Sequence, residues 1–101
     1  MTELEIALPS HRSPVQIEHS IERACVAAGL RLTLKATLKQ YPGCLHWPYK
    51  RGAERGTLEI TYWPRERRAW FKVARGREGE WMASLVPHLK RAIEQDGETT
   101  C

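Results

Sequence analysis

Residues 56–76, GTLEITYWPRERRAWFKVARG, hold two segments in which apolar and polar side chains alternate, joined by the tetrapeptide PRER. Alternation with a period of two is typical of a strand with one buried face, and a polar, proline-containing tetrapeptide is typical of a turn. Closing this hairpin pairs apolar side chains on one face, namely Tyr62 with Ala69, Ile60 with Phe71 and Leu58 with Val73. The other face receives two tryptophans and an opposite-charge pair: Trp63, Trp70, Glu59 and Lys72.

The alternating pattern continues toward the N-terminus through two more hairpins. Residues 30–39 alternate leucine or alanine with arginine, threonine or lysine, and the turn sequence QYPG follows. Closing that turn pairs Leu38 with Leu45, Ala36 with Trp47 and Leu34 with Tyr49. The glycine-bounded turn RGAERG keeps the same face apolar in the next pair of strands, so we predict a four-stranded antiparallel meander. Pro48 has no backbone N–H to donate, and we expect an irregularity there.

Two helices and a short N-terminal strand complete the predicted order β-α-β-β-β-β-α. The alternation of residues 3–8 predicts the strand, and the sequence SPVQ at 13–16 predicts a capped helix start before an apolar stripe that runs to Ala28. The sequence GEWMASLVPHLKRAIEQ at 79–95 predicts the second helix, which Pro87 should either kink or divide.

The apolar face of the predicted sheet needs a second layer, and the two amphipathic helices provide it. We therefore predict an α+β two-layer sandwich, with both helices on one face of the antiparallel meander. At 101 residues the chain has room for one domain. We assign residues 1–96 to that domain and residues 97–101 to a flexible C-terminal tail.

The composition argues against several classes of protein. Apolar runs are interrupted well before the roughly 20 residues of a membrane span, and residues 1–10 lack the basic start of a signal peptide. We therefore expect a cytoplasmic protein with no membrane partner. Cys25, Cys44 and Cys101 form no C-x-x-C pair, which argues against a disulfide framework and a structural zinc site. We predict no metal and no cofactor.

Positive charge is concentrated in one part of the sequence. Residues 31–77 contain 12 Lys and Arg against 3 acidic residues, a net charge of +9, whereas the rest of the chain has a net charge of −5. The predicted registers place many of these basic groups on the sheet face away from the helices. The candidate binding residues on that open face are Arg31, Lys35, Lys39, His46, Lys50, Trp63, Arg68, Trp70 and Lys72.

Two binding functions suit such a face. Two tryptophans on a solvated sheet are more than solubility requires, so the leading hypothesis is self-association as a homodimer, or binding of another protein. Basic groups beside aromatic rings also suit single-stranded RNA or DNA, because phosphates pair with the charges and bases stack on the rings. The alternative hypothesis is therefore a single-stranded nucleic-acid-binding module.

An enzyme is a remote third alternative. Cys44 and His46 are two residues apart on a predicted strand, so they share a face and could act as nucleophile and base. The other histidines, His11, His19 and His88, fall on other elements and leave a metal there without further ligands. A chance pairing on a solvated face is the simpler interpretation, and we assign no catalytic residue.

Overall fold

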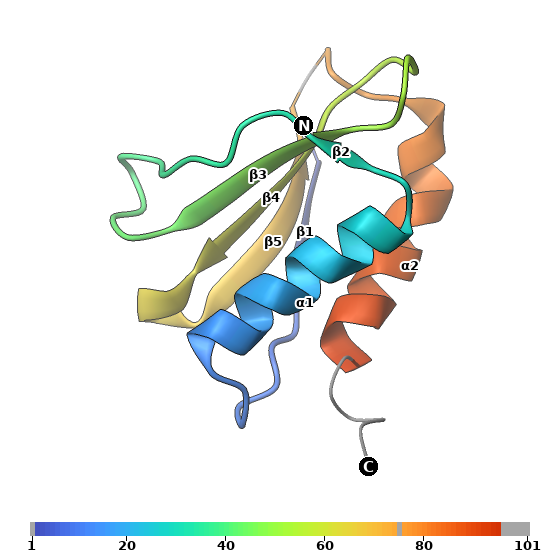
Figure 1. Ribbon diagram of the computed structural model, residues 1–101. Helices are drawn as coiled ribbons and strands as arrows, with labels where there is room; N and C mark the ends of the chain where they lie inside the picture. The colour runs from blue at the N-terminus through green and yellow to red at the C-terminus, as the bar shows by residue number, and fades with distance from the viewer. Residues whose placement is uncertain (1, 75, 96–101) are drawn as a thin grey trace.

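The computed structural model describes residues 2–74 and 76–95, and Figure 1 shows their arrangement. The elements are β1 (Thr2–Ile6), α1 (Pro14–Ala27), β2 (Arg31–Leu32), β3 (Leu45–Lys50), β4 (Leu58–Trp63), the 3-10 turn η1 (Pro64–Glu66), β5 (Arg68–Val73) and α2 (Glu80–Gln95). The strands form one antiparallel sheet in the order β1-β5-β4-β3-β2, and both helices lie on one side of it (Figure 1). The predicted fold class and element order are confirmed.

Helix α1 begins where the sequence predicts. The Ser13 hydroxyl accepts a hydrogen bond from the Gln16 N–H at 3.2 Å, and the Gln16 side chain accepts one from the Ser13 N–H at 2.8 Å. This reciprocal capping box satisfies two backbone donors that a helix start leaves without partners. After the helix, Gly29 adopts a φ of +79°, a left-handed conformation that favours glycine and turns the chain toward β2.

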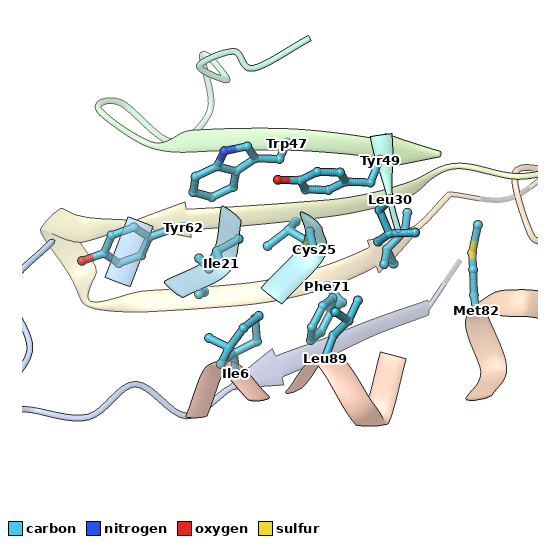
Figure 2. Packing of buried hydrophobic residues seen from close by; sticks show 14 of the residues in the cluster. Ile6, Ile21, Cys25, Leu30, Trp47, Tyr49, Tyr62, Phe71, Met82 and Leu89 are labelled. Carbon is cyan, nitrogen blue, oxygen red and sulfur yellow. The ribbon is translucent and has the colours of Figure 1, made fainter. Parts of the chain in front are cut away.

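The two hairpins that join β3, β4 and β5 have the predicted registers. Trp47 lies opposite Ile60, and Ile60 lies opposite Phe71. Their side chains pack against the helices, and Figure 2 shows labelled members of this core: Ile6, Ile21, Cys25, Leu30, Trp47, Tyr49, Tyr62, Phe71, Met82 and Leu89. The core therefore lies between the sheet and the helix layer, and the opposite face of the sheet points away from it.

The first predicted hairpin differs from the structure. Strand β2 contains only two residues, and Leu32, instead of Leu34, lies opposite Tyr49. Beyond it, Ala36 bridges His46. The register with β3 therefore shifts by one residue between these two pairings. As a result, side chains after the shift point to the face opposite to the one that the alternation predicts. The prediction that Leu34 is buried is wrong, because this side chain is 71% exposed.

Pro48 explains why the ladder between β2 and β3 breaks. The backbone groups of His46 point toward β2, where they exchange two hydrogen bonds of 2.9 Å with Ala36, and the Pro48 carbonyl accepts one from Thr33 at 3.0 Å. Because proline has no N–H, Pro48 cannot donate a hydrogen bond to the segment that pairs with it. The expected irregularity is present, but it falls in the partner segment and leaves β3 continuous.

β1 and α2 occupy one edge of the molecule. β1 pairs with β5, which places Glu3 opposite Lys72 and Glu5 opposite Trp70. α2 continues through Pro87 as a single helix, so this proline does not divide it. Neither helix in the described part of the chain has the length and apolar composition to cross a membrane. The predicted tail at 97–101 lies outside the described residues.

Candidate functional site

The open face of the sheet, on the side away from the helices, carries its side chains in rows across the strands. One row contains Pro48, Glu59, Lys72 and Glu3, and the next contains His46, Thr61, Trp70 and Glu5. Two further cross-strand pairs flank these rows, Arg31 with Lys50 and Trp63 with Arg68. Apart from Lys35 and Lys39, the candidate binding residues therefore lie on this face, as the sequence predicts.

Residues 33–44, called here the covering loop, fold across part of this face. The Tyr41 ring lies 5.1 Å, centroid to centroid, from both Trp63 and Trp70. The Trp63 Nε1–H donates to the Pro42 carbonyl at 2.9 Å. As a result Trp70 is only 4% exposed, and the expectation that its ring faces solvent is wrong. Lys39 lies on the covering loop and is exposed.

His46 is buried on this same face. Its Nδ1 lies 2.9 Å from the Thr61 hydroxyl, and its Nε2 lies 3.2 Å from a Glu59 carboxylate oxygen. A neutral ring that donates from Nε2 to Glu59 and accepts at Nδ1 from Thr61 satisfies both contacts. Burial lowers the pKa of His46, and it outweighs the opposing effect of the Glu59 charge. His46 is therefore a structural link between β3 and β4 in this conformation.

Cys44 and His46 do not form a nucleophile and base pair in this structure. The Cys44 thiol is 1% exposed, and its Sγ accepts a hydrogen bond from the Leu38 N–H at 3.3 Å. Both ring nitrogens of His46 contact other groups, so neither is placed to take the thiol proton. Across residues 2–74 and 76–95, no group of three or more His, Cys, Asp or Glu side chains could hold a metal ion.

Lys35 lies on the helix side of the sheet. Its Nζ donates to Glu18 and Glu22 of α1, at 2.8 Å for Glu22, and lies 5.5 Å from the centroid of the Trp47 ring. The predicted position of Lys35 on the open face is wrong, because this residue falls where the side chains change faces between the two pairings of β3. Its charge stabilises the contact between α1 and β3 instead.

Glu22 is the acceptor at the centre of that contact. One of its carboxylate oxygens accepts from Lys35 and also from Trp47 Nε1, at 2.9 Å. Burial favours the neutral acid, but the hydrogen bonds from Lys35 and Trp47 outweigh it, so the pKa of Glu22 is lowered. Hydrogen bonds to Glu18 and Glu22 correspondingly raise the pKa of Lys35.

We expect the Glu22→Gln variant to lose about 0.5–1 kcal/mol of stability near neutral pH, the range for a partly exposed ion pair. Because folding lowers the pKa of Glu22, its carboxylate stabilises the fold above the ordinary pKa of 4.5. That contribution disappears as the pH falls through the folded-state pKa. Urea unfolding between about pH 7 and about pH 3 should therefore show a smaller acid-induced loss in the variant than in the wild type.

The matched control for this variant is Glu54→Gln, which removes a carboxylate from an exposed pair with Arg51. Its effect on the unfolding free energy at neutral pH should be smaller. A Glu22→Gln curve that runs parallel to the wild-type curve over the whole acid range would contradict the role given to Glu22.

The two edges of the open face differ in charge, because acids balance basic residues at the β1 edge and basic residues lie side by side at the β2 edge. At the β1 edge, Glu5 accepts two hydrogen bonds from Arg68, at 3.0 and 3.1 Å, and Glu3 lies beside Lys72. At the other edge, Arg31 lies directly opposite Lys50. Sequence reasoning missed the two acids: the alternation of residues 3–6 shows that they share a face, but no local signal places β1 beside β5.

Comparisons with known proteins assign no family to this chain. No protein-family model, no curated protein and no solved structure matches it. A functional assignment therefore rests on the residues of its own surface.

Proposed function

We propose that this chain is a non-enzymatic binding domain that self-associates through the open face of its sheet. The observation that carries the proposal is the charge difference between the edges of this face: Glu3 and Glu5 balance Lys72 and Arg68 at the β1 edge, whereas Arg31 and Lys50 make the β2 edge basic. Complementary potentials steer encounter and fix the orientation of two surfaces. A surface with both signs of charge is also better matched to a second protein surface than to a phosphate backbone.

The strand order selects one symmetric arrangement of two copies. β1 and β2 lie at opposite edges of the sheet. Face-to-face stacking about a two-fold axis parallel to the strands places the β1 edge of each copy over the β2 edge of the other. A two-fold axis parallel to the sheet plane but perpendicular to the strands would place each edge over its own counterpart. The first arrangement keeps the two basic β2 edges apart and brings each over the carboxylates of Glu3 and Glu5 in the other copy, and we propose this one.

The covering loop supplies apolar surface for this contact. The rings of Tyr41 and Trp63 contact each other on the open face, and each is half-buried. Partly buried aromatic rings near the centre of an interface usually contribute more to affinity than charged groups at its rim. Removing these side chains from water would therefore add affinity, while the charged edges would determine the orientation.

Single-stranded nucleic acid is the second candidate ligand. The observation that favours it is the position of Arg31 directly opposite Lys50, since two adjacent like charges suit a polyanion. Two findings reduce its support. Trp70 is buried and offers no free ring for stacking, and Lys35 faces the helices.

Charge reversal at one edge tests the proposed dimer. Arg31→Glu should raise the dimer Kd about tenfold or more at low salt, because it sets like charges face to face across the interface. Adding Glu3→Lys to this variant should restore association. The control Arg91→Glu makes the same change in net charge on an exposed position of α2 and should leave the Kd unchanged. Sedimentation equilibrium measures all four proteins.

Two results would overturn self-association through this face: a protein that stays monomeric at high concentration, and equal weakening by Arg31→Glu and Arg91→Glu. A titration with mixed-sequence single-stranded oligonucleotides at low salt decides the second candidate. Binding that Arg31→Glu weakens and Arg91→Glu leaves intact would favour nucleic acid as the ligand.

A further inference from the structure

A second surface, which shares Glu3 and Glu5 with the proposed dimer contact, lies where β1 meets the N-terminal half of α2. A groove of about 420 Å³ runs there, and its lining is mostly apolar. Its lining includes the apolar side chains of Leu4, Val73, Met82 and Val86 and the acids Glu3 and Glu78. Leu4 is 37% exposed, although Ile6 on the same face of β1 is buried under the helix layer. The groove is therefore an extension of the core that no described residue covers.

Strand β1 presents a free edge beside this groove. It is the terminal strand of the sheet and pairs with β5 alone. The N–H of Ala7, just after β1, donates to a Glu94 carboxylate oxygen of α2 at 2.8 Å. Because backbone direction alternates along a strand, Glu3 and Glu5 share the outward direction of Ala7. Their N–H and C=O groups are thus positioned to pair with an added strand.

Helix α2 forms the other wall of this groove and lacks one backbone hydrogen bond there. Residue 87 is proline, so the carbonyl of Ala83 lacks the N–H that would satisfy it within the helix. Both Ala83 and Pro87 line the groove.

The side-chain pattern of β1 defines the chemistry of the chain that would bind. Residues on one side of an added strand would lie next to Leu4 and enter the apolar groove. Residues on the other side would lie next to the carboxylates of Glu3 and Glu5, and Glu78 adds a third acid at the groove. An added strand that alternates apolar and basic side chains matches both sides.

A second copy of β1 does not match this edge. Antiparallel pairing of two β1 strands about Leu4 would place Glu3 of each copy opposite Glu5 of the other, and like charges directly opposite each other are destabilising. We propose that the free edge of β1 and its groove bind an extended segment of a partner protein in which apolar residues alternate with lysine or arginine.

The test uses a short capped peptide of alternating lysine and valine. Fluorescence anisotropy should show saturable binding, and an alternating glutamate–valine peptide should bind at least about tenfold more weakly. Ala83→Trp fills the groove from an exposed position and should weaken binding of the lysine–valine peptide by about tenfold or more. Ala92→Trp, at another exposed position of α2, should not. Circular dichroism checks the folding of each variant.

If Ala83→Trp fails to fold, Glu78→Lys provides the second variant, because it reverses one charge at the groove. This variant should bind the lysine–valine peptide more weakly and the glutamate–valine peptide more tightly, so the ratio of the two Kd values should be smaller than in the wild type. The proposal is overturned if the lysine–valine peptide does not bind saturably, if a folded Ala83→Trp binds it as the wild type does, or if Glu78→Lys leaves the preference unchanged. Loss of the dimer in Ala83→Trp would also overturn it, by assigning the groove to a second copy.

Discussion

The Phe71→Ala variant is expected to lose about 3–5 kcal/mol of unfolding free energy, the usual range for truncating a large buried aromatic side chain. Phe71 is 2% exposed and lies on β5, between β1 and β4, where it faces the helix layer (Figure 2). It has Ile60 opposite on one side and Leu4 on the other. Its removal leaves a cavity bounded by three strands and a helix, which the surrounding chain can fill only in part.

Chemical denaturation of Phe71→Ala beside Val73→Ala measures this effect. Val73 points to the same side of β5 two residues later, but it is only half-buried at the groove, so its truncation should cost about 1 kcal/mol. Equal losses for the two variants would show that the helix layer does not cover Phe71 as described.

Local sequence signals are sufficient to predict how β3, β4 and β5 pair, which is the part of the sheet that contains Phe71. The registers of β3, β4 and β5 follow from short turns and from the requirement that one face stay apolar, so pairing Ile60 with Phe71 needs no long-range information. The same holds for α1, whose start follows from Ser13, Pro14 and Gln16. The position of β1 does not follow in this way, because its partner β5 is more than 60 residues away along the chain.

The segment after Leu32 shows why a regular alternation of apolar and polar residues does not by itself determine the length of a strand. Its pattern predicts a long strand, but a strand also needs a partner that offers both a donor and an acceptor at each paired position. Pro48 lacks the donor, and the ladder ends within two residues. The burial of Trp70 and the position of Lys35 both depend on this break. Only the three-dimensional course of the covering loop reveals them.

The Trp70→Ala variant gives the second large expected effect, a loss of about 3 kcal/mol or more. Its ring is 4% exposed, contacts Tyr41 edge-on and lies 4.9 Å from the Arg68 guanidinium carbon. Truncating it removes the support for the covering loop as well as its own buried surface. The loop should then become more mobile, which hydrogen exchange at the amides of residues 36–41 would detect.

Trp63→Ala is the matched comparison, since this ring lies on the same face and contacts the same tyrosine. Trp63 is only half-buried, so we expect a loss of about 1–2 kcal/mol from one aromatic contact and the hydrogen bond to Pro42. If both tryptophans faced solvent, as the sequence suggests, the two variants would differ little and each would cost less than about 0.5 kcal/mol. Equal, small losses in chemical denaturation would therefore contradict the covering loop, whereas a loss at least about 1 kcal/mol larger for Trp70→Ala would place its ring in the interior.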